Sequence, residues 1–159
     1  MTLTDRTAYI KEARAKYNSY NNEWQHDYFN HGNGGYLVVD KQRIEQSEIN
    51  KQEKKKYDKE HDMCLTLAQN GHKVEYLKMT EGCFDIYLNG IAADLKKTKS
   101  YNNISGYAKK AIREQRAELV VFEFAKETGD IHAELELLKK INIHGYFYFS
   151  NNKSRVCEF

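Results

Sequence analysis

Two aspartates and a lysine flank a predicted tight turn in the middle of this sequence. Asp85 and Asp94 stand on either side of Asn89-Gly90, a dipeptide that favours a type I′ hairpin turn because both of its residues accept a positive φ. A two-residue turn pairs the aspartates across the hairpin, and side-chain alternation places Lys96 on the same face. Like charges placed so destabilise a sheet. We therefore predict that a divalent metal ion joins the carboxylates; the alternative is that both are solvated on an exposed outer face.

Two more polar side chains interrupt the apolar stripes of predicted helices. Glu60 falls within the apolar arc of a helix expected over residues 54–70, when each residue turns by about 100°. Gln115 takes the next position on the apolar stripe of a helix expected over residues 104–117. Buried polar groups need hydrogen-bond partners. Either these residues contribute to the site, or they have structural roles. In the second case Glu60 extends to the edge of its stripe or pairs with a lysine, and Gln115 lies in a frayed last turn.

The elements around these residues follow from periodicity and turn signals. We expect a helix over residues 4–20, a polar loop over 18–35 and a strand over 36–39. The elements expected after these lie at 54–70 (helix), 73–78 (strand), 83–96 (hairpin), 104–117 (helix), 119–122 (strand), 130–141 (helix) and 145–149 (strand). This order predicts an α/β (α+β) fold with a central mixed β-sheet flanked by helices.

Length and composition limit the class of protein. The 159 residues fit one domain with a short addition, and we expect an N-terminal helical and loop appendage (1–50) before the main domain (51–159). The formal net charge of +2 permits a polyanionic partner without requiring one. No apolar run approaches membrane-spanning length, so no membrane span is expected. Three widely separated cysteines predict neither a disulfide framework nor a zinc site.

Basic residues follow the hairpin in a loop and along one flank of the next predicted helix. The loop also carries an aromatic residue, and this combination could contact phosphates and stack a base. Short lysine-rich loops are also commonly just solvated. The predicted nucleic-acid-binding residues are Lys97, Lys99, Tyr101, Lys109, Lys110 and Arg113.

The order of elements and polar residues resembles the PD-(D/E)xK nuclease superfamily. Within it, the chain is most similar to the C-terminal toxin nucleases of contact-dependent growth inhibition systems, several of which cut transfer RNA. The resemblance covers about residues 54–124 and implies a restriction-endonuclease-like αβββαβ core. Phe84 stands where the family name has proline, and Asp94 replaces the commoner glutamate.

The resemblance implies a role for each residue of the site. Asp85, Asp94 and Glu60 would hold Mg²⁺ or Mn²⁺, a hard cation suited to oxygen ligands. Lys96 would position or activate the attacking water, and Gln115 would support the cluster or touch the substrate. The metal would polarise a phosphoryl oxygen and favour formation of hydroxide. The implied catalytic set is therefore Glu60, Asp85, Asp94, Lys96 and Gln115.

The function expected from the resemblance is a metal-dependent endonuclease toxin acting on nucleic acid, with tRNA favoured over DNA. Such a toxin would act in the bacterial cytoplasm, delivered there as part of a larger secreted protein, and a cognate immunity protein would bind it. Three alternatives remain open. They are a metal-independent RNase toxin using His61 or His72, a DNA endonuclease or resolvase, and a non-catalytic interaction module.

Overall fold

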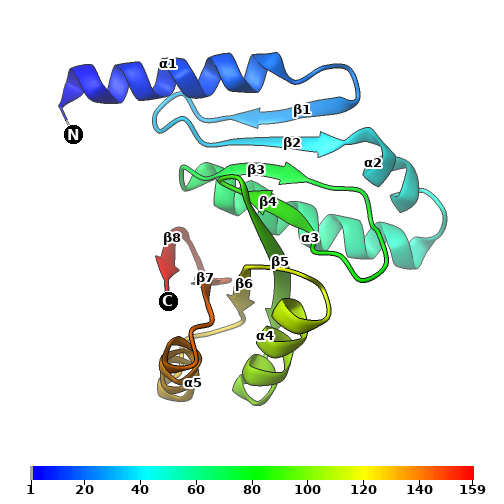
Figure 1. Cartoon of the computed structure of the whole chain (residues 1–159), viewed down its shortest axis with the longest axis vertical. Helices are drawn as coiled ribbons and strands as arrows, with labels where there is room; N and C mark the ends of the chain where they lie inside the picture. Colours follow the sequence, from blue (N-terminus) through cyan, green and yellow to red (C-terminus); the bar gives the residue numbers. More distant parts are fainter. Residues whose placement is uncertain (1) are drawn as a thin grey trace. The chain divides into compact units, whose positions relative to one another are not determined.

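The computed structural model describes residues 2–159 and divides the chain into two compact units (Figure 1). Unit 1 comprises Met1–Met79 and Tyr87–Gly90, and unit 2 comprises Thr80–Ile86 and Ile91–Phe159. Each unit contains parallel and antiparallel strand pairs with helices packed on them, which confirms the predicted α/β (α+β) class.

Unit 1 is built on three paired strands. Strand β2 pairs antiparallel with β1 and parallel with β3. Helix α1 precedes these strands, and α2 and α3 connect β2 to β3. The bounds are α1 Leu3–Ser19, β1 Trp24–Phe29, β2 Tyr36–Asp40, α2 Lys41–Ser47, α3 Lys51–Gln69 and β3 Lys73–Tyr76, and the short strand β4, Ile86–Leu88, begins in unit 2 and ends in unit 1.

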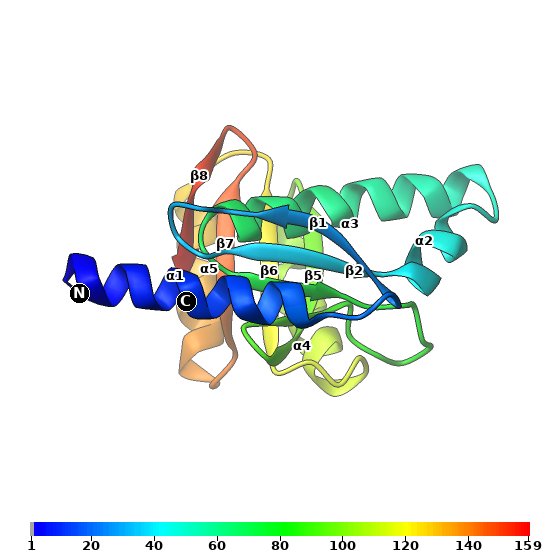
Figure 2. The ribbon, with the colours of Figure 1, turned by 90° about the horizontal axis from the view of Figure 1, so that it is seen from above.

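Helices α1 and α3 cover opposite faces of the unit 1 strands (Figure 2). Tyr17 of α1 packs against Tyr36 of β2, with ring centroids 5.6 Å apart. Tyr57 of α3 stacks on Tyr76 of β3 at 5.6 Å. Tyr76 is in register with the residue three positions after Tyr36, and side chains alternate along a strand. The two contacts therefore lie on different faces.

Unit 2 has a parallel centre and an antiparallel edge. Strands β5, β6 and β7 are parallel, and β8 pairs antiparallel with β7. The crossovers contain α4 and α5, as parallel strands require. The bounds are β5 Ile91–Thr98, the 3₁₀ turn η1 Tyr101–Asn103, α4 Ile104–Arg113, β6 Leu119–Phe124, α5 Gly129–Lys140, β7 His144–Phe149 and β8 Asn152–Glu158.

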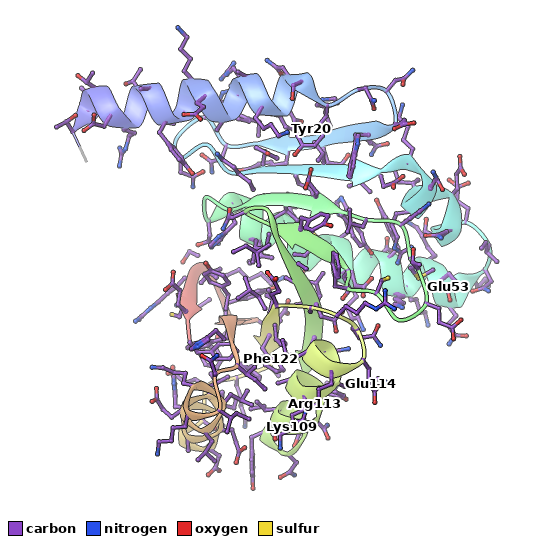
Figure 3. All side chains as sticks on the ribbon, viewed as in Figure 1. Tyr20, Glu53, Lys109, Arg113, Glu114 and Phe122 are labelled. Atoms are coloured by element: carbon purple, nitrogen blue, oxygen red, sulfur yellow. The ribbon has the colours of Figure 1, made fainter. Side chains whose placement is uncertain are left out.

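The core of unit 2 lies between one face of its sheet and the helices α4 and α5. Phe122 of β6, labelled in Figure 3, is fully buried there with Ala108 of α4 and Leu135 of α5. Gly145 of β7 pairs with Val120 of β6. A Cβ at this glycine would collide with the carbonyl oxygen of Val120, so only glycine permits the observed approach of the two strands.

Two expectations about secondary structure are wrong. The segment 18–35, expected to be a loop, contains β1, because pairing with β2 holds it extended despite its polar side chains. The helix expected over residues 104–117 ends at Arg113, where the chain turns back toward β6 and Arg116 adopts a positive φ of 61°. The last residues, unassigned from the sequence, form β8.

The compact units divide the chain at a different place from the predicted boundary near residue 50. Strand β2, which precedes that boundary, pairs along its length with β3, which follows it. Helix α3 packs on both strands. Strands β1 and β2, from the first 50 residues, therefore share a sheet with β3, which follows the predicted boundary.

Candidate functional site

Asp94 and Lys96 form an ion pair on the α4 face of β5. The Asp94 side chain is only 4% exposed, and Lys96 Nζ lies 3.0 Å from its Oδ2. Oδ2 has no hydrogen bond besides this ionic contact. The Lys96 ammonium also lies 5.8 Å from the ring centroid of Tyr107 on α4. The pair thus combines a buried carboxylate with a cation held beside it.

Asp85 is attached to β5 beside this pair, although it lies just outside β4. Its backbone N–H donates to the carbonyl of Ala93 at 3.1 Å, and its Oδ2 accepts the N–H of Leu95 at 2.8 Å. The turn predicted at Asn89-Gly90 is confirmed by φ values of 52° and 84°. However, these two hydrogen bonds replace the regular pairing of Asp85 with Asp94 that the sequence predicts. The reason is that strand β4 begins only at Ile86, one residue after Asp85.

The segment that carries Gln115 returns to the same strand. Gln115 lies beyond α4, and its N–H donates to the carbonyl of Lys110 at 3.1 Å. Three residues later the N–H of Glu118 donates to the carbonyl of Ala92 at 2.9 Å. This bond anchors the segment two positions before Asp94, so Asp85, Asp94, Lys96 and the Gln115 segment all converge on β5.

Glu60 belongs to unit 1, where it is buried on α3. Its Oε1 accepts hydrogen bonds from Tyr76 Oη at 2.9 Å and from Arg43 Nη2 at 3.4 Å. The Arg43 side chain is fully buried, and its guanidinium lies 5.3 Å from the ring centroid of Tyr57 and 5.2 Å from that of Tyr76. The expected lysine partner is therefore an arginine. Burial and the nearby Glu60 carboxylate raise the pKa of Tyr76.

The acidic residues of unit 2 can be tested against the needs of a divalent cation. Across residues 2–159, no three His, Cys, Asp or Glu side chains come together as a group that could hold a metal ion. Mg²⁺, however, is commonly held by one or two carboxylates, with water and substrate phosphates as the other ligands. Asp94, whose buried Oδ2 pairs with Lys96, and Asp85, whose Oδ2 accepts the N–H of Leu95, offer two such carboxylates.

The predicted nucleic-acid-binding residues all lie in unit 2. Lys99, Tyr101, Lys110 and Arg113 are exposed, whereas Lys109 is half-buried; Figure 3 labels Lys109 and Arg113 on α4. Lys97 is partly exposed and forms an ion pair with Glu123 at 3.1 Å. A pocket of about 350 Å³ lies at the carboxyl ends of the parallel strands and is lined by Lys97, Thr98, Lys99, Ala125 and Ser150.

Glu123 beneath this pocket is a buried charge that the sequence interpretation misses. Tyr148 Oη and Ser150 Oγ donate to its carboxylate at 2.7 and 2.6 Å, and Lys97 pairs with it. Burial alone would raise the pKa of Glu123, but the hydrogen bonds from Ser150, Tyr148 and Lys97 lower it below its ordinary value. The signal in the sequence is a glutamate inside the apolar strand Leu119–Phe124.

The two histidines of the metal-independent alternative lie in unit 1. His61 Nε2 is 2.7 Å from Asp27 Oδ2, and its ring stacks on Tyr57. His72 Nδ1 lies 3.0 Å from Asn89 Nδ2. His61 therefore has a carboxylate that can orient its imidazole, a common arrangement for a general base.

Fold and site together define an α/β domain with an acid–lysine centre on one strand of a mixed sheet. No protein family matches the sequence, and no curated protein sequence does so either. Among solved structures, a chain of the CdiA-CT/CdiI toxin and immunity complex from Burkholderia pseudomallei is similar, with a TM-score of 0.51 and 16% identity over 64% of this chain and 81% of that one. The fold of this chain is therefore similar to that of a chain of this toxin and immunity complex.

The structure also bears on the expected absence of a membrane span. None of the helices within residues 2–159 combines the length and the apolar character that crossing a bilayer needs.

Proposed function

We propose that this protein is a metal-dependent nuclease toxin that cleaves RNA, with transfer RNA as the favoured substrate. The observation that supports this most strongly is the buried carboxylate of Asp94, whose Oδ2 contacts the ammonium of Lys96 at 3.0 Å and has no hydrogen bond besides. Burying a carboxylate costs free energy unless cations or hydrogen bonds compensate it fully. A cation bound there would offset that cost, and the toxin-like fold is consistent with an enzyme of this kind.

Asp85 and Asp94 would hold Mg²⁺ or Mn²⁺. When bound, the metal supplies Lewis-acid polarisation of the phosphodiester. The hydrogen bond from the Leu95 amide fixes the Asp85 carboxylate relative to β5. Lys96, already held against Asp94, would position the attacking water and offset the negative charge that develops on the phosphate oxygens. Gln115 would support the cluster.

The exposed basic residues of unit 2 would bind the substrate. Phosphate contacts supply affinity without sequence information, while Tyr101, 42% exposed, offers a ring on which an unpaired base could stack. As a toxin, the protein would be delivered into the bacterial cytoplasm as part of a larger secreted chain. A cognate immunity protein would neutralise it by covering the basic surface.

Incubation of the full chain with total tRNA, and separately with plasmid DNA, tests this function. We expect tRNA fragments on a denaturing gel with Mg²⁺ or Mn²⁺ and none with EDTA. Absence of cleavage of both nucleic acids with either metal would overturn the nuclease proposal. Cleavage of plasmid DNA alone would overturn the assignment of RNA as the substrate.

Matched variants assign the activity to the centre on β5. Asp94→Asn and Lys96→Ala should each slow cleavage by about 100-fold or more, the scale of removing one catalytic group. Asp130→Asn and Lys140→Ala, which change exposed residues on α5, should cleave at the wild-type rate. Wild-type rates in both β5 variants would contradict the assignment.

A second candidate is metal-independent RNA cleavage by His61. The 2.7 Å contact with Asp27 favours it, since a carboxylate that orients an imidazole is a common feature of general bases. Burial would raise the pKa of Asp27, but its hydrogen bonds to His61 and Gln25 lower it overall. Cleavage that survives EDTA and disappears in His61→Ala would select this mechanism over the first.

A further inference from the structure

Unit 1 contains a pocket that the nuclease chemistry does not use. Its volume is about 530 Å³, within the range of pockets that hold small ligands. Helix α1, the strands β2 and β3 and the Asn89-Gly90 turn contribute its wall. The lining residues are Tyr9, Lys16, Tyr20, Tyr36, Gly71, Lys73, Glu75, Asn89 and Gly90.

Two lysine ammonium groups in this pocket lie over aromatic rings. Lys16 Nζ is 5.1 Å from the centroid of Tyr20, and Lys73 Nζ is 4.9 Å from that of Tyr9. No carboxylate in residues 2–159 forms an ion pair with either lysine. Cation–π contacts at exposed sites contribute little, so both cations remain available to an anionic ligand.

The tyrosines present both rings and hydrogen-bonding groups. Tyr9 is 38% exposed, and Tyr20, the C-cap of α1 labelled in Figure 3, is half-buried. Tyr20 Oη donates to Glu75 Oε2 at 2.7 Å and lies 3.1 Å from Tyr36 Oη. This network holds the Glu75 carboxylate at the pocket wall, where it can accept hydrogen bonds from a ligand.

We propose that this pocket binds an unpaired nucleotide. A nucleotide combines a planar base with an anionic phosphate, and the pocket offers aromatic rings for the base together with lysines for the phosphate. The Glu75 carboxylate would accept from the amino or imino N–H groups on the Watson–Crick edge of the base. Every lining residue belongs to unit 1, so binding depends neither on the carboxylates of β5 nor on a metal ion.

The single tryptophan of the chain provides the measurement. Trp24 packs edge-on against Tyr20 with ring centroids 5.5 Å apart, so a ligand that stacks at Tyr20 changes its surroundings. Titration of the full chain with guanosine monophosphate in EDTA should give a saturable change in tryptophan fluorescence. Inorganic phosphate should bind with an affinity at least about tenfold lower, because it lacks a base to stack.

Charge variants of the two pocket lysines, Lys16 on α1 and Lys73 on β3, locate the binding. Lys16→Glu should weaken guanosine monophosphate binding about tenfold or more, as expected for loss of a charged contact, and Lys73→Glu should do the same. Lys11→Glu, an exposed change on α1 outside the pocket, should bind like wild type, as should Asp94→Asn. Circular dichroism melting confirms that each variant folds.

Three results would overturn the proposal. They are the absence of a saturable signal, equal affinity for phosphate and nucleotide, and wild-type affinity in both folded pocket variants. None of them concerns cleavage, so failure here and failure of the nuclease proposal are separate outcomes.

Discussion

The Asp85 carboxylate accepts the backbone N–H of Leu95, the residue between Asp94 and Lys96, at 2.8 Å. One side chain thus takes the place of a backbone carbonyl beside the candidate catalytic pair. This relationship gives Asp85 two separable roles, as an acceptor that satisfies β5 and as a charge that could bind metal.

The two roles of Asp85 can be separated by comparing two variants. Asp85→Ala leaves the Leu95 amide without its acceptor and should destabilise the protein by about 1–3 kcal/mol, whereas Asp85→Asn retains an amide oxygen and should stay close to wild type. Both should lose cleavage. Urea unfolding and a tRNA cleavage assay measure the two effects, and full cleavage by Asp85→Asn would show that its charge is dispensable.

Metal binding at Asp94 should be visible without any substrate. Mg²⁺ at about 100 times its dissociation constant stabilises a folded protein by about 2.7 kcal/mol when it binds only that state. We therefore expect added Mg²⁺ to raise the melting temperature of the wild type and to leave that of Asp94→Asn unchanged. An equal rise in both proteins would place the metal elsewhere.

Glu123 should make the stability of the protein depend on acid pH. Its pKa is lower in the folded state than its ordinary value of 4.5, so the stabilisation is complete above about pH 4.5 and is lost as pH falls through the lower folded value. Glu123→Gln should be less stable than wild type at pH 7, and the difference should shrink on acidification. Urea unfolding at a series of pH values measures it; a constant difference would contradict the assigned contacts.

Glu60 can be tested as a structural partner or as a metal ligand. Removing one member of a buried ion pair commonly costs about 3–5 kcal/mol, so Arg43→Ala should be strongly destabilised. Glu60→Gln keeps an acceptor for Tyr76 but removes the charge. If Glu60 binds metal, Glu60→Gln should lose cleavage while remaining folded. Normal cleavage would show that Glu60 acts only as the structural partner of Arg43 and Tyr76.

Helices and strands that bury apolar side chains at a regular spacing are predictable from this sequence. Strand β6 and helix α5 have apolar residues at the spacing that the core of unit 2 requires, and the sequence pattern identifies both. Strand β1 differs because only backbone pairing with β2 keeps it extended. Hydrophobic periodicity does not report such pairing, so the segment resembles a loop.

Part of the candidate site is also predictable from the sequence, and part depends on contacts that residue spacing does not report. Asp94 and Lys96 are two positions apart on one strand, and alternation alone places them on one face. The hydrogen bond between Asp85 and Leu95 depends on an irregular end of β4, which residue spacing does not encode. The Glu123 cluster depends on the registers of β5 with β6 and of β6 with β7, which are set by the fold.

A substitution at Gly145 on β7 should affect the candidate site on β5, which lies two strands away in the sheet. Asp94 is in register with Val120, and Val120 with Gly145, so acid, valine and glycine lie in one row across three strands. A methyl group on the glycine would press on the valine backbone, and a tightly packed interior passes such strain to its neighbours. A substitution at Gly145 would therefore disturb the proposed cleavage centre without contacting either a metal ion or the substrate.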